Sequence, residues 1–116
     1  EDRHEYKFHT RVMRPWGSAT TILENKFYRI RMLEIMPGKS MSLQRHQQRS
    51  EHWVVLQGIA DVQRGDEKVL LKENESAYIP IGIRHRLGNS EKIPLQIIEV
   101  QQGQYLDDDD IERLKQ

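Results

Sequence analysis

The chain has 116 residues, enough for one domain of ordinary size and too few for two. Hydrophobic residues make up 36% and charged residues 31%, which is typical of a soluble globular protein and excludes a low-complexity polymer or a membrane span. The 18 Lys and Arg balance the 18 Asp and Glu, so no net field favours nucleic acid or a membrane as a partner. Cysteine is absent, so any metal must be bound by histidine, carboxylate or amide oxygen.

The first residues are polar and no apolar stretch follows them, so we expect no secretory signal peptide. Together with the lack of cysteine, this predicts a cytoplasmic protein. A chain this short buries a modest share of its surface, which favours a closed β architecture or a contact between two copies.

Short β-type segments separated by turn residues make up most of the chain. Residues 14–18 are predicted to form a loop, because Pro15 fixes φ and Gly17 frees the next turn. A strand follows at 28–36, in which Arg29 and Arg31 alternate with apolar side chains. Further strands are predicted at 40–46, 53–56, 59–63, 68–71, 76–79 and 94–101, with a hairpin turn at 64–67.

The last predicted strand and the C-terminal segment that follows it carry further expectations. The apolar stretch within 94–101 indicates a strand buried on both faces. The aspartates at 107–110 predict an N-cap and a negative first turn for a short C-terminal helix, with Ile111 and Leu114 on one side. A calcium loop is excluded there, because it needs alternating ligands and a glycine. Short strands with turns every ~8 to 12 residues indicate an all-β sandwich or small barrel, and a jelly roll fits the count.

A cluster of metal-type ligands lies in the β-segments. Residues two apart in a strand project from the same face, so Gln44 and His46 reach one point. A chain reversal through 47–50 would bring Glu51 beside them, and His85 could complete the set. The N2O2 set suits zinc, manganese, iron, cobalt or nickel. The plainer alternative is that both histidines are hydrogen-bonded residues near a barrel mouth.

Two motifs then identify a fold family. The first runs Gly38, five residues, Gln44-Arg45-His46, four residues, Glu51, six residues, Gly58. The second runs Pro80-Ile81-Gly82, two residues, His85, three residues, Asn89. Together they resemble the two cupin motifs, with glutamine in place of the usual first histidine, and the resemblance implies a cupin jelly-roll barrel.

A longer series of motifs narrows the family. It consists of Arg14-Pro15-Trp16-Gly17-Ser18, Pro37-Gly38-Lys39, Ser42-Leu43-Gln44, Arg49-Ser50-Glu51-His52-Trp53, Tyr78-Ile79-Pro80, Ile98-Glu99-Val100-Gln101 and Gly103-Gln104-Tyr105-Leu106. The series resembles the type II mannose-6-phosphate isomerase domain, usually the C-terminal part of bifunctional proteins that also make GDP-mannose. We therefore expect residues 1–116 to be a single cupin domain, with its motifs within 11–113 and no room for the guanylyltransferase domain.

The resemblance implies an enzyme that interconverts mannose 6-phosphate and fructose 6-phosphate through a cis-enediolate. It implies a divalent metal, with zinc first and Mn, Co, Ni, Fe or Mg as alternatives, that acts as a Lewis acid. The implied metal ligands are Gln44, His46, Glu51 and His85. A homodimer is also implied, since cupins commonly pair.

The remaining site residues follow from the needs of the reaction. The general base is either His52 or Glu99, although strict alternation after Glu51 would turn His52 to the opposite face. The phosphate calls for cations: Arg49 is ranked first, as both a catalytic and a substrate-binding residue, and the other candidates are Arg14 and Lys39. Trp16 and Trp53 would form a wall for the sugar ring, or else pack in the core or at a dimer contact.

Three differences from the family pattern keep other functions open. Gln47-Gln48 replaces a run of histidines, Ala19 replaces a tyrosine, and the family's usual Tyr-Gly-Arg tail does not occur within these 116 residues. One alternative is a non-catalytic module that binds a sugar phosphate or sugar nucleotide. Another is a different metal-dependent cupin enzyme, such as an Fe(II) oxygenase that draws a facial triad from His46, Glu51 and His85.

Overall fold

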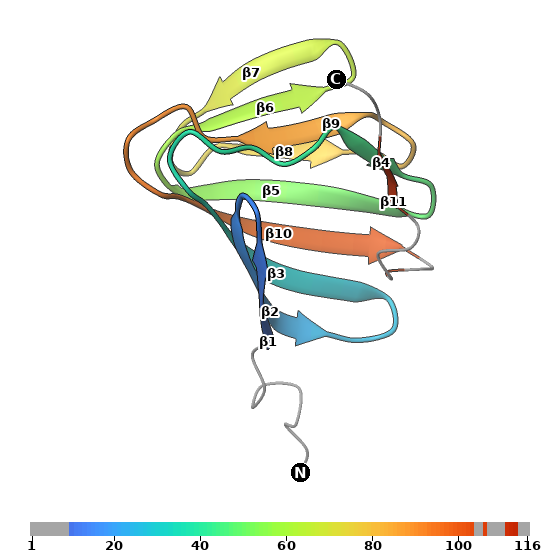
Figure 1. Ribbon diagram of the computed structural model, residues 1–116. Coiled ribbons are helices and arrows are strands. Elements are labelled where there is room, and N and C mark those ends of the chain that lie inside the picture. Colours follow the sequence, from blue (N-terminus) through green and yellow to red (C-terminus); the bar gives the residue numbers. More distant parts are fainter. Residues whose placement is uncertain (1–9, 104–105, 107–110, 114–116) are drawn as a thin grey trace.

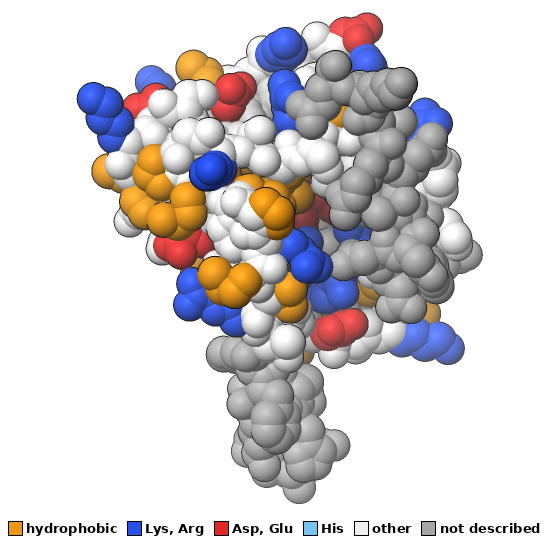
Figure 2. Space-filling model, in the orientation of Figure 1, with side chains coloured by type: hydrophobic (Ala, Val, Ile, Leu, Met, Phe, Trp, Pro, Cys, Tyr) orange, Lys and Arg blue, Asp and Glu red, His pale blue; other side chains and the backbone are white. Residues whose placement is uncertain are grey.

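The computed structural model describes residues 10–103, 106 and 111–113, and all regular structure among them is β-strand (Figure 1). The strands are β1 (Thr10–Arg14), β2 (Gly17–Glu24), β3 (Tyr28–Ile35), β4 (Gln44–His46), β5 (Arg49–Gln57), β6 (Ala60–Arg64), β7 (Glu67–Leu71), β8 (Ser76–Ile79), β9 (His85–Gly88), β10 (Leu95–Gly103) and β11 (Ile111–Arg113). This part of the chain contains no helix that is long and apolar enough to cross a membrane. Positive and negative side chains are both spread over the face seen in Figure 2, as the balanced composition predicts.

The strands form two antiparallel sheets that enclose one interior. One sheet has the order β1-β2-β3-β10-β5-β8 and the other has the order β11-β4-β9-β6-β7. From β3 onward the chain passes repeatedly from one sheet to the other, which is the winding of a jelly roll. Strands β4, β5, β9 and β10 therefore face one interior, although β4 and β5 lie far from β9 and β10 in the sequence.

The apolar core fills one end of this interior. Leu33 on β3 lies opposite Ile97 on β10, which lies opposite Val55 on β5, and all three are fully buried. Val62 and Leu87 face them from the other sheet and are buried in the same cluster. Burial of each such side chain contributes roughly 1.5–3 kcal/mol, so this end of the jelly roll holds the sheets together.

The loop predicted at 14–18 is shorter than expected. Arg14 ends β1 and Gly17 begins β2, so only Pro15 and Trp16 form the turn. Every residue of β1 is exposed, and such a strand has no alternation of apolar and polar side chains to reveal it. The Cβ of any other residue at Gly17, where φ is +153°, would lie 1.9 Å from the carbonyl oxygen of Glu34. Glycine is therefore required for β2 to approach β3.

The C-terminal helix is the expectation that the structure contradicts. Ile111–Arg113 form β11, which pairs antiparallel with β4 in the register Ile111 to His46. Strand β4 offers unpaired backbone groups at one edge, and pairing with them outweighs the local preference for a helix. The aspartates at 107–110 and Leu114 lie outside the described residues.

Two further strands differ from the prediction. Only Gln44–His46 of the segment 40–46 is a strand, although Ser40 forms an isolated bridge with Gly88 on the unpredicted strand β9. Strand β10 is not buried on both faces, because its burial alternates strictly and only the odd-numbered residues from Leu95 to Gln101 are buried. The hairpin predicted at 64–67 is confirmed, with Arg64 opposite Glu67.

Candidate metal centre

Three strands from the two sheets bring the central ligands together. His46 on β4, Glu51 on β5 and His85 on β9 are all buried, and each offers an atom within 4.8 Å of the others. His46 Nε2 lies 3.3 Å from Glu51 Oε2, and His85 Nε2 lies 3.9 Å from Glu51 Oε1. The two imidazole rings stack with centroids 5.3 Å apart. The centre thus lies between the sheets, where β4, β5 and β9 meet (Figure 1).

Gln44 supplies an amide on the same side of β4. It lies two residues before His46, is buried, and pairs through its backbone with His85. Its Nε2 donates to the carbonyl oxygen of Ser42 at 3.2 Å. Because the nitrogen is used in this way, Oε1 is the atom that Gln44 can offer to an ion.

The tautomer of His85 prepares it for a cation. Nδ1 lies 3.0 Å from the carbonyl oxygen of Ile83, and a carbonyl only accepts, so Nδ1 carries the proton and Nε2 carries the lone pair. Nε2 is buried and has no hydrogen-bond partner among the described residues. Burial also lowers the pKa of His85, which keeps the ring neutral. A buried lone pair aimed at a carboxylate fits a metal ion.

The buried carboxyl of Glu51 supports the same conclusion. Burial, and after it the nearby Glu99 carboxylate, raise the pKa of Glu51 to about 8 against the opposing effect of Arg49, so at neutral pH a bound cation would be needed to hold this carboxyl in its charged form. Two imidazole nitrogens, a carboxylate oxygen of Glu51 and an amide oxygen form a set that suits a divalent first-row ion such as zinc. The residues present therefore fit the metal that the fold family implies.

Arg49 lies directly against two of these ligands. Its Nε donates to Glu51 Oε2 at 3.1 Å, and its Nη2 lies 3.0 Å from His46 Nε2. Its Nη1 donates to the carbonyl oxygen of Leu106 at 2.9 Å. The sequence placed Arg49 at the site, and the structure brings it there.

Glu99 belongs to the same buried layer. Burial alone would raise the pKa of Glu99, but the ion pair with Arg31, in which Nε lies 2.7 Å from Glu99 Oε1, outweighs it and lowers the pKa to about 2. Gln101 Nε2 donates to the same oxygen at 2.8 Å. Trp53 Nε1 lies 3.4 Å from Glu99 Oε2 and 3.2 Å from Glu51 Oε1. The Glu99 carboxylate is thus ionised at neutral pH and tied to the centre.

His52 and Arg14, two other residues predicted for the site, lie away from the candidate metal centre. His52 is exposed on the outer face of β5, with its ring 6.4 Å from that of Tyr78, because alternation after Glu51 turns it outward. Arg14 is exposed at the end of β1, and β2, β3 and β10 lie between that strand and β5. The structure brings neither residue to the candidate metal centre.

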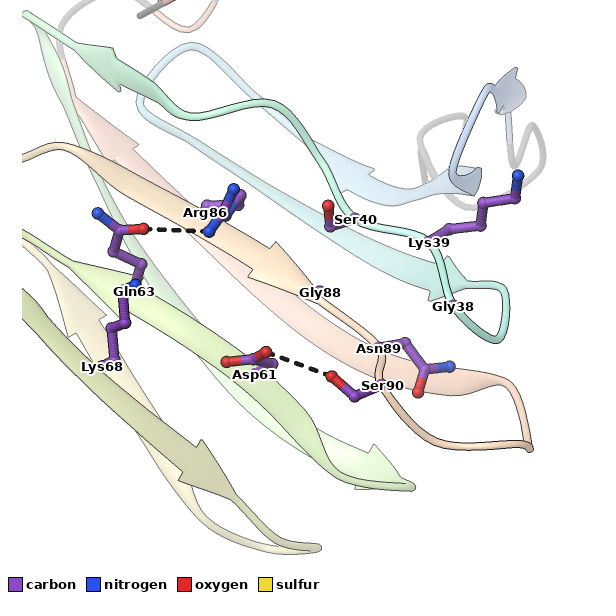
Figure 3. A pocket seen from close by; sticks show the side chains of 10 residues that line it. All are labelled: Gly38, Lys39, Ser40, Asp61, Gln63, Lys68, Arg86, Gly88, Asn89 and Ser90. Carbon is purple, nitrogen blue, oxygen red and sulfur yellow. Dashed lines mark hydrogen bonds between the residues drawn. The ribbon is translucent and has the colours of Figure 1, made fainter. Parts of the chain in front are cut away.

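Lys39 lies in a separate hollow of about 410 Å³ on the outer side of the five-stranded sheet. His85 and Leu87 point inward from β9, so Arg86 points outward into this hollow and donates to Gln63 Oε1 at 3.3 Å. Figure 3 shows Lys39 at one edge, with its side chain directed away from Gln63. Lys39 is therefore not a neighbour of the proposed ligands.

Arg29, Arg31 and Gln101 form a polar layer whose position the sequence left open. Arg29 and Arg31 were candidates for the phosphate as well as for a solvated outer face, and they lie on the same face of β3 as the buried Leu33 and Ile35. The spacing of two residues between Arg29, Arg31, Leu33 and Ile35 was the feature of the sequence that indicated an inward position. Trp53 is fully buried in the apolar core, and Trp16 packs against that core.

Comparison with known proteins agrees with the fold and the motifs. The family model described as "Mannose-6-phosphate isomerase C-terminal" matches residues 1–116. The chain is 48% identical over 113 residues to xanthan biosynthesis protein XanB of Xanthomonas campestris pv. campestris strain B100, with 97% of this chain covered. It is 48% identical over 115 residues to alginate biosynthesis protein AlgA of Pseudomonas aeruginosa, with 99% of this chain covered. In each case it spans 24% of the relative.

Solved structures of low sequence identity share the fold. The capsular polysaccharide assembling protein CapF from Staphylococcus aureus superposes with a TM-score of 0.80 at 18% identity, covering 92% of this chain and 34% of CapF. The cupin domain of Cnp3 from Schizosaccharomyces pombe gives a TM-score of 0.72 at 13% identity, covering 74% of this chain and 64% of that one. With a cupin jelly roll and a family match along its whole length, the chain belongs to the family of mannose-6-phosphate isomerase C-terminal domains.

Proposed function

We propose that this chain is a metal-dependent aldose–ketose isomerase that interconverts mannose 6-phosphate and fructose 6-phosphate. The observation that carries the proposal is the buried set of His46, Glu51 and His85, with Gln44 beside them, in a chain of this family. Zinc is the proposed ion, and Mn, Co, Ni, Fe and Mg are alternatives. A bound divalent ion would polarise the substrate carbonyl and stabilise the negative charge of an enediolate.

The reaction moves a proton between two neighbouring carbons, so it needs a base inside the barrel. We propose Glu99 over His52 for this role, because only Glu99 lies in the buried layer beside Glu51. Its ionised form is the one that accepts a proton, although a pKa of about 2 makes it a weak base. Glu99→Gln is therefore expected to lose more turnover than His52→Gln, and the reverse order would assign the base to His52.

Arg49 and Arg29 support a site for an anionic group. Arg49 Nη1 and Arg29 Nη2 both donate to the carbonyl oxygen of Leu106, at 2.9 and 3.1 Å. Two guanidinium groups that converge on one oxygen are suited to hold a phosphate oxygen or a sugar hydroxyl. We propose Arg49 as the first substrate contact and Arg29 as its partner, whereas Arg14 and Lys39 have no place in this arrangement.

The test is a coupled assay for fructose 6-phosphate formed from mannose 6-phosphate. The protein is stripped with a chelator and then restored with Zn, Mn, Co, Ni, Fe or Mg. Metal-dependent turnover is the expected result. If folded, metal-loaded protein shows no turnover with any ion, the isomerase is wrong and a non-catalytic module for a sugar phosphate or sugar nucleotide takes its place. Oxygen uptake with iron would instead identify an oxygenase.

A cytoplasmic homodimer completes the proposal, and sedimentation velocity tests its assembly.

A further inference from the structure

A line of buried polar contacts runs across three strands behind the proposed ligands. In the sheet register, Arg31 on β3 lies opposite Glu99 on β10, and Glu99 lies opposite Trp53 on β5. We infer that Arg31 is a positioning residue: it fixes Glu99 and, through Trp53, the carboxylate of Glu51, and so sets the affinity of the centre for a divalent ion. The inference rests on the metal binding of the proposed function and not on the isomerase step.

The contacts form a continuous chain. Arg31 Nε donates to Glu99 Oε1 at 2.7 Å, and the arginine side chain is only 12% exposed. Trp53 Nε1 is shared between Glu99 Oε2 at 3.4 Å and Glu51 Oε1 at 3.2 Å. Glu51 Oε1 is also the oxygen that faces His85 Nε2, 3.9 Å away. The indole thus holds the same oxygen that faces a second proposed ligand.

Charge burial explains why Arg31 matters for this chain of contacts. The side chains of Glu51 and Glu99 are 3% and 1% exposed, so two carboxylates share one dry layer. A buried charge that loses its partner is strongly disfavoured, so without Arg31 the Glu99 side chain is expected to leave its place. That displacement alters the hydrogen bond that Trp53 donates, and Glu51 Oε1 then loses its fixed position.

The experiment compares Arg31→Gln and Arg31→Lys with a matched control, Arg64→Gln. Arg64 also pairs with a glutamate, because its Nη2 lies 2.6 Å from Glu67 Oε1, but this pair is exposed on the five-stranded sheet. Zinc affinity of the full chain is measured by competition with a chromophoric chelator, and circular dichroism confirms that each variant is folded. We expect Arg31→Gln to weaken zinc binding by about tenfold or more, Arg31→Lys to restore part of it, and Arg64→Gln to match the unmodified chain.

A double variant separates positioning from general damage. If Arg31 acts through Glu99, zinc affinity in Arg31→Gln with Glu99→Gln equals that of Glu99→Gln alone. The inference is overturned if folded Arg31→Gln binds zinc within about twofold of the unmodified chain. It is also overturned if the losses of zinc affinity in Arg31→Gln and in Glu99→Gln simply add in the double variant. Should Arg31→Gln fail to fold, Arg31→Lys and the double variant decide by the same criteria. An unmodified chain that binds zinc without turnover removes the isomerase only, whereas one that binds no zinc overturns this inference.

Discussion

Along the inner faces of the long strands, single residues change from apolar to charged. On β3 the inward side chains run from Ile35 and Leu33 to Arg31 and Arg29, and on β10 they run from Ile97 to Glu99. The apolar end supplies the burial that stabilises the fold. The charged end costs free energy unless each group is paired, so its side chains either bond one another or bind an ion.

Replacement of Glu51 by glutamine tests the ligand set at the residue scale. The amide keeps the size of the side chain but removes the anionic oxygen between His46 and His85. We expect bound zinc to fall from near-stoichiometric to trace amounts by elemental analysis of dialysed protein. Glu67→Gln, an exposed change on β7, is the control and keeps its zinc. Full occupancy in Glu51→Gln would show that the ion binds elsewhere.

Glu51 also predicts how the stability of the metal-free protein depends on pH. Its pKa rises from 4.5 to about 8 on folding because of burial, so between these values the folded chain retains a proton that the unfolded chain releases. The free energy of unfolding should therefore decrease as pH rises from about 4.5 to about 8. Urea unfolding of chelated protein measures this, and Glu51→Gln should flatten the decrease. A rise in stability over the same range, assignable to Glu51, would contradict the sign.

At the scale of elements, the register between β5 and β10 assembles the polar layer. Gln101 lies opposite Glu51 on one side and Arg29 on the other, and Gly103 lies opposite Arg49. A slip of β10 by one residue would turn its inward side chains, Gln101 among them, to the outer face. The position of Arg49 beside the ligands therefore depends on the close approach of β10 to the start of β5.

Gly103→Ala tests that approach. An added Cβ would lie 2.2 Å from the carbonyl oxygen of Gln48 and 2.7 Å from Arg49 Cα, so the backbone itself must move. We expect the free energy of unfolding to fall by about 1–3 kcal/mol, as in other overpacked sites, and zinc affinity to change with it.

The matched control is Gly65→Ala in the hairpin turn, where the added Cβ meets no atom within 4 Å. With φ at +61°, alanine there should cost only about 1–2 kcal/mol and leave zinc affinity unchanged. Urea unfolding and the chelator competition measure both quantities. Equal zinc affinity in the two variants would mean that the approach of β10 does not position Arg49.

For the whole molecule, the proposed centre joins the two sheets. His46 and His85 come from the five-stranded sheet and Glu51 comes from the six-stranded sheet, so a bound ion would cross-link them. A ligand that binds only the folded state stabilises it by about 2.7 kcal/mol at a concentration of 100 times Kd. We expect chelation to lower the Tm by several degrees, as measured by scanning calorimetry. The same treatment should leave the Tm of Glu51→Gln unchanged, and an equal drop in both would mean that the chelator acts elsewhere.

Part of the fold and of the candidate site was predictable from short motifs. The resemblance of two motifs to those of cupins, together with the number of strands, predicted the cupin fold, which the comparisons confirm. The same motifs carry the candidate ligands, of which the structure brings His46, Glu51 and His85 together and buries Gln44 on the same strand as His46. The hairpin at 64–67 followed from its turn residues, which are neighbours in the chain.

The exposed edge strand and the C-terminal strand were not predictable in this way. Strand β1 buries no side chain, and β11 forms because β4 offers an unpaired edge. Both depend on partners that are distant in the sequence, and pairing with such a partner overrides local propensity.

Because the sequence lacks cysteine, it restricts the ligands of any metal to histidine, carboxylate or amide. It also shows which residues can share one face of a strand. Which of the two faces lies inside depends on how the sheets pack. The tertiary structure turned Arg31 and Glu99 inward and His52 outward. The physical reason is that alternation specifies two faces equally well, and only the packing of one sheet against the other selects the face that is removed from water.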